Sequence, residues 1–264
     1  MYKAYRLQVP EGHFKPRHVI GGEHMCSIEN DSLRKPLSAF ILEDGNIDGG
    51  KLSGSWFPEV NAEVFISHSH ADTKLAHGLA GWMFENFGIY SFIDSTVWGH
   101  YAHLLEQLCK AHAPYPSLWE SYKDELSPHV HLMLASALSV MMDKTECVIF
   151  IHSENSVIHN TAQTRTRSPW LLHEVQMMRL LRQRSLMEHR KTLFQESHGS
   201  EKRSHEVQIH HPIDLTRLLV IRESDMLQWE LMVSLKQILA QFKVPIKPPL
   251  KPLDWLYENI TSPT

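Results

Sequence analysis

The 264-residue chain lacks several features that would assign it to a class of protein directly. It has only three cysteines, and no two of them share the CxxC spacing of zinc and redox sites, so free thiols in a reducing cytosol are expected. No apolar run approaches the roughly 20 residues that span a bilayer. A formal net charge of −4 gives no reason to expect nucleic acid or an anionic membrane as a partner. We therefore expect a cytoplasmic protein with neither partner.

Phosphate-binding and nucleophile motifs are also missing. Neither GxGxxG nor a complete GxxxxGK[ST] occurs, which argues against a Rossmann dehydrogenase and a P-loop NTPase. A Ser-His-Asp hydrolase could be drawn from Ser67, His68 and Asp94. No GxSxG nucleophile elbow supports that assignment.

Short apolar strands alternate with helices in the remaining pattern. Strands are predicted at residues 63–67, 89–94, 146–152 and within 206–211. Helices are predicted from the Asp72 cap to near Gly88, around 101–112 and over 128–143. A further helix is predicted to start at Ser168-Pro169-Trp170, with an apolar stripe of Leu171, Val175 and Met178. The last predicted helix carries Leu231, Leu235, Ile238 and Phe242. This alternation predicts an α/β fold, a parallel sheet flanked by helices on both faces.

Composition divides the chain into three parts. Residues 1–60 are interrupted by glycines and are predicted to form an N-terminal extension with short strands around 39–42 and 51–56. Residues 61–242 form the domain, with insertions near 113–127 and 186–205. Residues 243–264 form a Pro-rich C-terminal tail that we expect to begin in an extended conformation.

The ligand site of such a sheet lies outside the carboxyl ends of its strands. The loops after Ser67, Asp94 and His152 are therefore the places where a site is expected. Polar residues crowd at the first two of these places.

Four segments carry a resemblance to a known family. In chain order they are VFISHSHAD, SFIDSTVWG, TECVIFIHSENS and SPWLLHE. Over roughly residues 62–241 the chain resembles the bacterial TIR (Toll/interleukin-1 receptor) domain, in particular stand-alone anti-phage defence proteins of the Thoeris type. The resemblance implies a flavodoxin-like fold and cleavage of the nicotinamide–ribose bond of NAD+, which is the substrate, with no cofactor and no metal. Free ADP-ribose, a cyclic form and an acceptor conjugate remain open as products.

The resemblance assigns catalysis to Glu174. The family places its catalytic glutamate on the helix after the third strand, four residues beyond an aromatic residue, which is Trp170 here. Residues i and i+4 share one helix face, so the indole and the carboxylate would border the same cleft. Nicotinamide leaves as a neutral ring, so one carboxylate that stabilises the developing ribosyl cation can suffice.

The other substrate-binding residues implied by the resemblance follow the first two strands. Ser67 and His68 come after the first strand, where the family contacts phosphate or ribose. Asp94, Trp98 and Tyr101 come after the second, and Tyr101 falls where the family often places an aromatic ring that stacks on the nucleotide.

Two alternatives of different classes stay open. His68-x-His70-x-Asp72 nearly matches the HxHxDH motif of zinc hydrolases of the metallo-β-lactamase type, although Thr73 replaces the last histidine and the many helices do not suit a β sandwich. The other alternative is a non-catalytic TIR adaptor or scaffold, a class that commonly lacks the glutamate that this chain keeps. Expected partners are further TIR domains through self-association, and a separate effector or a phage-derived trigger.

Overall fold

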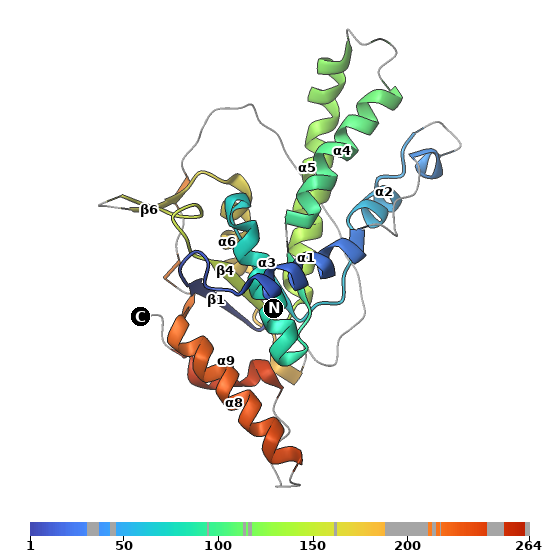
Figure 1. Ribbon diagram of the computed structural model, residues 1–264. Helices are drawn as coiled ribbons and strands as arrows, with labels where there is room; N and C mark the ends of the chain where they lie inside the picture. Colours follow the sequence, from blue (N-terminus) through green and yellow to red (C-terminus); the bar gives the residue numbers. More distant parts are fainter. Residues whose placement is uncertain are drawn as a thin grey trace.

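A five-stranded parallel sheet flanked by helices forms the centre of the molecule (Figure 1). In this computed structural model the described residues are 1–30, 37–42, 46–93, 95–112, 115, 118–160, 163–187, 211–212, 215–216, 218–241 and 251–261. The predicted α/β class, a parallel sheet with helices on both faces, is confirmed.

The strand order in this sheet is β3-β2-β4-β1-β8. The strands are β1 (Lys3–Gln8), β2 (Val64–Ser67), β3 (Ser91–Ile93), β4 (Cys147–Ile151) and β8 (Leu219–Arg222). Every residue of β2, β3 and β4 is buried, as expected for short apolar strands covered on both faces. If β2 is counted as the first strand, β3 as the second and β4 as the third, these three lie in the order 2-1-3 of flavodoxin-like sheets. The next position in the sheet is occupied by the N-terminal strand β1.

Three of the four predicted strands are confirmed as β2, β3 and β4, with ends shifted by one or two residues. The fourth falls mostly on residues 206–210, which lie outside the described part of the chain. Its last residue begins β7 (His211–Pro212), which belongs to a separate antiparallel sheet with β5 (Ile158–Asn160) and β6 (Gln163–Thr166).

The N-terminal residues 1–60 contribute more to the fold than the sequence predicts. We expected them to lie outside the domain, but β1 pairs with β4 on one side and with β8 on the other. Within β1, Ala4, Tyr5 and Leu7 are buried. Lys3 and Arg6 interrupt this apolar pattern. For this reason the pattern of apolar residues does not predict the strand.

Neither of the two short strands expected in this region forms, although Ile41 makes an isolated antiparallel bridge with Ile47. Residues 37–40 form the 3₁₀ helix η1, and residues 49–56 form helix α2 (Gly49–Trp56). The side chain of Asp48 accepts a hydrogen bond from the backbone N–H of Lys51 at 2.9 Å and caps α2. Leu52 and Trp56, four residues apart, are its buried side chains.

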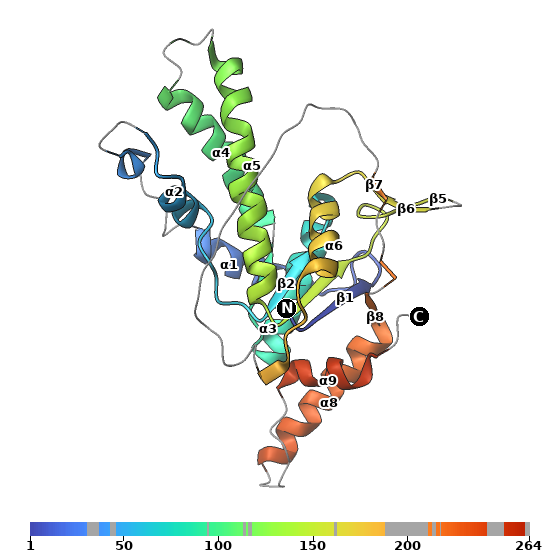
Figure 2. The same cartoon turned by 180° about the vertical axis from the view of Figure 1, so that it is seen from behind.

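Helices cover both faces of the sheet, and Figures 1 and 2 view these faces from opposite sides. One face carries α5 (Trp119–Lys144) and α6 (Pro169–Leu180), with α4 (Ser95–His112) and α2 beside α5. The other carries α3 (Thr73–Phe87), α8 (Glu223–Gln241) and α9 (Pro252–Asn259), with α1 (Pro16–Asn30) on α3. Each face has its own apolar core, so Phe65 of β2 points into one core and its neighbours Val64 and Ile66 into the other.

Two segments that were expected to lie outside the regular secondary structure contain helices. The insertion near 113–127 shrinks to a short connection, because α5 begins at Trp119 and continues through Pro128. The insertion near 186–205 lies mostly in residues 188–205, outside the described part of the chain. Part of the tail 243–264 forms α9, whose Leu253 and Leu256 are buried.

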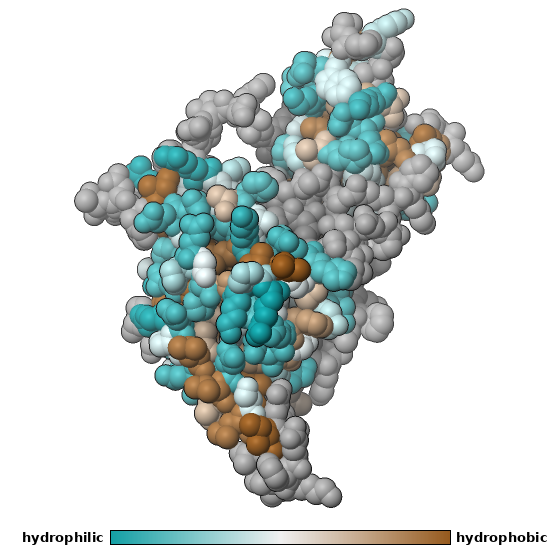
Figure 3. Space-filling model, viewed as in Figure 1, coloured by the Kyte–Doolittle hydropathy of each residue, from teal (hydrophilic) through white to brown (hydrophobic). Residues whose placement is uncertain are grey.

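Helix α8 is apolar on two opposite sides. Met226, Trp229 and Val233 face the core. The residues expected to form its apolar stripe, together with Leu227, instead lie on the surface as a patch of Leu227, Leu231, Leu235 and Ile238 (Figure 3). Phe242 lies outside the described residues. Among the described helices, none combines the length and the apolar character needed to cross a membrane.

Candidate functional site

The connections of the sheet reverse direction between β2 and β4. From β2 the chain runs outward to β3 at the edge, and from β3 it returns to β4 on the other side of β2. Such a switch point leaves a crevice at the carboxyl ends of the two strands, the usual ligand position in open α/β sheets. Ser67 ends β2 and His152 follows β4 at this point.

A buried serine–glutamate pair lies at this switch point. The hydroxyl of Ser67 donates a hydrogen bond to Oε2 of Glu174 at 2.6 Å, and both side chains are completely buried. Ser168 caps α6 by accepting from the N–H of Leu171 at 3.2 Å, and Pro169 takes the first helical position. This predicted start of α6 directs Glu174 to the carboxyl end of β2.

A second polar network joins the loops after β2 and β4. The carboxylate of Asp72 accepts hydrogen bonds from the Ser153 hydroxyl at 2.5 Å and from the Asn155 amide at 2.8 Å. Asp72 does stand at the N-cap position of α3, but its side chain makes no capping bond because it faces this loop instead. The network holds the two strand ends of the switch point together.

Three rings from three helices gather beside the N-terminus of α6. The ring of His131 lies 4.5 Å from that of Tyr101 and 5.7 Å from that of Trp170, with the latter pair stacked at 20°. Nδ1 of His131 lies 2.8 Å from the carbonyl oxygen of Ser127, and Nε2 lies 2.6 Å from the hydroxyl of Tyr101. A carbonyl only accepts, so Nδ1 donates to it. In the neutral ring, Nε2 then accepts from the Tyr101 hydroxyl. This arrangement fits a neutral imidazole.

Burial shifts the titration of these side chains. It lowers the pKa of His131, against the opposing effect of the Ser127 carbonyl, and raises the pKa of Tyr101. Burial likewise lowers the pKa of His173, whose Nε2 lies 3.1 Å from the Ser139 hydroxyl. All three groups therefore favour their neutral forms at neutral pH.

The residues predicted for the site fall into three groups. Ser67 meets Glu174, and Tyr101 lies close to Trp170, with ring centroids 6.5 Å apart. His68 is buried near His77 of α3. The pKa of His77 is lowered mainly by burial and further by His68. Successive strand residues point to opposite faces, so His68 leaves the face that Ser67 occupies. Asp94 and the side chain of Trp98 lie outside the described part of the chain.

The three residues of the possible zinc motif, His68, His70 and Asp72, have different surroundings. His68 is buried, His70 is exposed, and Asp72 is engaged by Ser153 and Asn155. Within the described ranges, no group of three or more His, Cys, Asp or Glu side chains is placed to hold a metal ion. A zinc hydrolase thus stays an untested alternative.

Sequence reasoning missed three polar residues at this end of the sheet. Ser153 and Asn155 follow β4, so their place after a strand end was a usable signal. His131 has no comparable signal, because its place in the ring cluster depends on how α4, α5 and α6 pack. No sequence signal gives that packing.

No protein-family model, curated protein or solved structure matches the chain. The site must therefore be interpreted from its own geometry and from the motifs.

Proposed function

We propose that this chain is a TIR-like enzyme that cleaves the nicotinamide–ribose bond of NAD+ and that Glu174 is its catalytic carboxylate. The observation that carries the proposal is the position of Glu174. It lies at the switch point of a parallel α/β sheet, where it accepts a hydrogen bond from Ser67 at 2.6 Å. A carboxylate at this position, on a helix that also carries Trp170, matches the motif of the family.

The chemistry needs one negative charge close to the ribose. The bond between C1′ and the pyridinium nitrogen breaks, and its electron pair stays on nicotinamide, which leaves neutral. The ribosyl cation that remains takes an oxygen from water, or another nucleophile, which then loses a proton. The carboxylate of Glu174 would stabilise this cation and hold the ribose hydroxyls, while the Ser67 hydroxyl orients the carboxylate.

The ring cluster supports the same placement of substrate. Trp170 precedes Glu174 by one helical turn and stacks on His131, which also contacts Tyr101. Aromatic faces about one helical turn from the carboxylate suit a flat heterocycle such as nicotinamide or adenine. The neutral state of His131 avoids placing a second positive charge against the cationic nicotinamide ring.

Catalysis by Glu174 requires local opening of the structure. Its side chain has 0% exposed surface, so NAD+ reaches the carboxylate only after a segment over it moves. Association with a partner or a second copy can drive such a change, because binding shifts the population of conformations. Self-association and a separate effector or phage-derived trigger, as part of anti-phage immunity, belong to this proposal.

The test compares the wild-type chain with Glu174→Gln and Glu154→Gln at high protein concentration. Glu154 is an exposed carboxylate just after β4, so its substitution makes the same charge change at the same end of the sheet. Glutamine at position 174 can still accept from Ser67, which keeps the local packing. Chromatography with mass detection measures nicotinamide release and the mass of the second product.

We expect Glu174→Gln to lower nicotinamide release about 100-fold or more, and Glu154→Gln to leave it unchanged. The product mass then distinguishes ADP-ribose, a cyclic form and an acceptor conjugate. Equal turnover by wild type and Glu174→Gln would assign catalysis to another residue. No turnover by the concentrated wild-type chain would favour the non-catalytic adaptor over the enzyme.

A non-catalytic TIR adaptor is the second candidate, and the burial of Glu174 is the observation that favours it. A buried carboxylate bonded to Ser67 can act simply as a clamp between β2 and α6. An adaptor would show concentration-dependent self-association by analytical ultracentrifugation without nicotinamide release. An enzyme would instead release nicotinamide, and Glu174→Gln would greatly reduce that release.

A further inference from the structure

A pocket of about 430 Å³ lies at the opposite end of the sheet from Glu174. Its walls come from the start of β1, the start of β8, the C-terminal turn of α6 and the residue Thr261 that follows α9. Strand β1 enters the sheet at Lys3, so the pocket is at the amino end of the strands. Its volume falls within the usual range for sites of small organic ligands.

The charged residues that line this pocket, among those that the structure describes, are both basic. Lys3 and Arg179 are both among the residues that line it, and none of the nine described lining residues is Asp or Glu. Nζ of Lys3 donates to the carbonyl oxygen of Tyr257 at 2.8 Å, which fixes the ammonium group while leaving further N–H donors. Arg179 is exposed on the last turn of α6. The two cations come from different elements that meet at the pocket.

Most of the other lining residues have apolar side chains. Ala4, Met178 and Leu218 are buried lining residues, while Gln183 and Thr261 add polar atoms at the exposed side. A ligand that fits this lining has a negatively charged group and an apolar or aromatic body.

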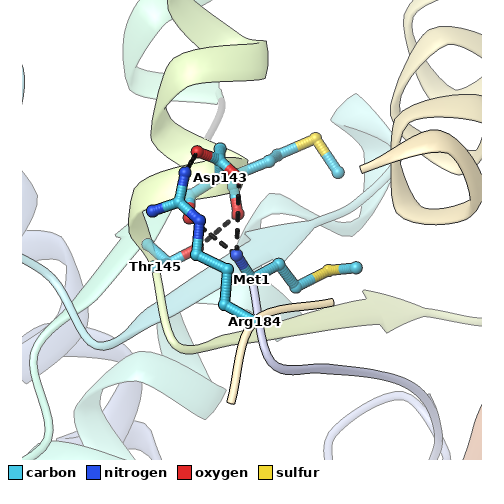
Figure 4. A network of polar contacts seen from close by, with 5 residues as sticks. Met1, Asp143, Thr145 and Arg184 are labelled. Carbon is cyan, nitrogen blue, oxygen red and sulfur yellow. Dashed lines mark hydrogen bonds and ion pairs between the residues drawn. The ribbon is translucent and has the colours of Figure 1, made fainter. Parts of the chain in front are cut away.

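The wall formed by residues 181–184 is attached to the start of β1 (Figure 4). The backbone N–H of Arg184 donates to the carbonyl oxygen of Met1 at 3.1 Å, and the Arg184 guanidinium pairs with Asp143. The amino group of Met1 donates to the carbonyl oxygen of Asp143 at 2.6 Å. These contacts bind α5, β1 and the segment after α6 into one unit, so this wall is preformed.

We propose that this pocket is a second ligand site, which binds a small organic anion through Lys3 and Arg179 and packs its apolar body against Met178. Arginine and lysine recognise phosphate and carboxylate groups through charge-assisted hydrogen bonds. The site does not depend on NAD+ cleavage. It contacts α6 one turn beyond Glu174, so a bound ligand would touch the helix that carries the candidate catalytic residue.

The test uses three matched probes with the full chain: phenyl phosphate, benzoate and phenol. Isothermal titration calorimetry measures affinity for wild type, Arg179→Gln, Lys3→Gln and the control Arg182→Gln. Arg182 is an exposed arginine on the same segment that does not line the pocket. Methyl NMR of ¹³C-labelled methionine, assigned with Met178→Leu, reports whether the probe binds next to Met178.

We expect at least one anionic probe to bind and to shift the Met178 methyl resonance, with phenol about tenfold weaker. Arg179→Gln and Lys3→Gln should each weaken this binding about tenfold, and Arg182→Gln should leave it unchanged. A preference between phenyl phosphate and benzoate identifies the anionic group. The proposal is overturned if neither anion binds at about 10 mM, or if folded Arg179→Gln and Lys3→Gln keep the wild-type affinity.

Discussion

The two faces of the central sheet are built on different principles. On the α3 face, α1 and α3 meet through glycines, and the rings of Trp82, Phe87 and Trp229 pack together with centroids 4.4–5.4 Å apart. On the α6 face, buried polar side chains make specific bonds, with Ser67 to Glu174 as the central pair. The α3 face is packed mainly by apolar side chains, although His18 and His68 are also buried there. The α6 face combines its apolar core with a completely buried serine–glutamate pair.

The two faces therefore relate differently to the stability of the fold and to the proposed function. A buried polar group costs free energy unless it is paired, whereas apolar packing stabilises without a specific partner. Polar groups on the α6 face are therefore expected only where their chemistry or their geometry is used.

The largest effect is expected for Gly81→Ala on the α3 face. A Cβ at this position would lie 1.9 Å from the carbonyl oxygen of His18, closer than real Cβ contacts allow, so α1 and α3 must separate. Overpacking at a rigid backbone contact should lower the free energy of unfolding by about 3 kcal/mol. Urea denaturation followed by circular dichroism measures it.

Gly54→Ala in α2 is the control for this substitution. A Cβ at Gly54 meets nothing within 4 Å, and alanine favours a helix over glycine. We expect a change between zero and a gain of about 1 kcal/mol. Equal destabilisation by both substitutions would show that the α1–α3 contact is not specially close.

A smaller loss of stability is expected for Ser67→Ala on the α6 face. The substitution removes the 2.6 Å hydrogen bond to Glu174 and leaves Oε2 buried without this donor. The expected cost is about 2 kcal/mol in the free energy of unfolding. Ser69→Ala is the control, because Ser69 lies two residues away, is only half-buried and makes no side-chain capping bond.

The double variant Ser67→Ala/Glu174→Leu tests whether the pair acts as a unit. Removing both polar partners should cost less than the sum of the single substitutions, because no buried group is then left unpaired. Additive costs would show that Ser67 and Glu174 contribute independently. Such a result would weaken the view that the α6 face is held by paired polar groups.

The sequence predicted the local parts of this architecture and missed those that depend on distant pairing. Strands β2, β3 and β4 have continuous apolar runs, and α6 has the Ser168-Pro169 start, so their types and positions could be read directly. Strand β1 was missed because Lys3 and Arg6 interrupt its apolar residues. Its place beside β4 is a long-range pairing that no local pattern records.

The same division applies to the candidate site. Ser67 was predicted to lie in the site because it ends a strand. The four-residue spacing of Trp170 and Glu174 predicted that both lie on the same face of their helix. Burial of Glu174 and the stacking of His131 on Trp170 arise from the packing of α5 against α6, which spacing along one chain segment does not specify.

The mildest effect is expected from pH, again on the α6 face. Burial lowers the pKa of His173 in the folded protein below the ordinary value of about 6.5 that it takes in the unfolded chain. Between these two values the unfolded chain binds more protons, so the free energy of unfolding rises with pH there and falls as pH drops below about 6.5. Urea denaturation at several pH values between about 5 and 7.5 measures this slope.

His173→Gln should reduce the slope, whereas His129→Gln, which replaces an exposed histidine of α5, should leave it unchanged. An identical slope in wild type and His173→Gln would mean that acid acts on other groups, and that the α6 face does not hold His173 in its neutral form.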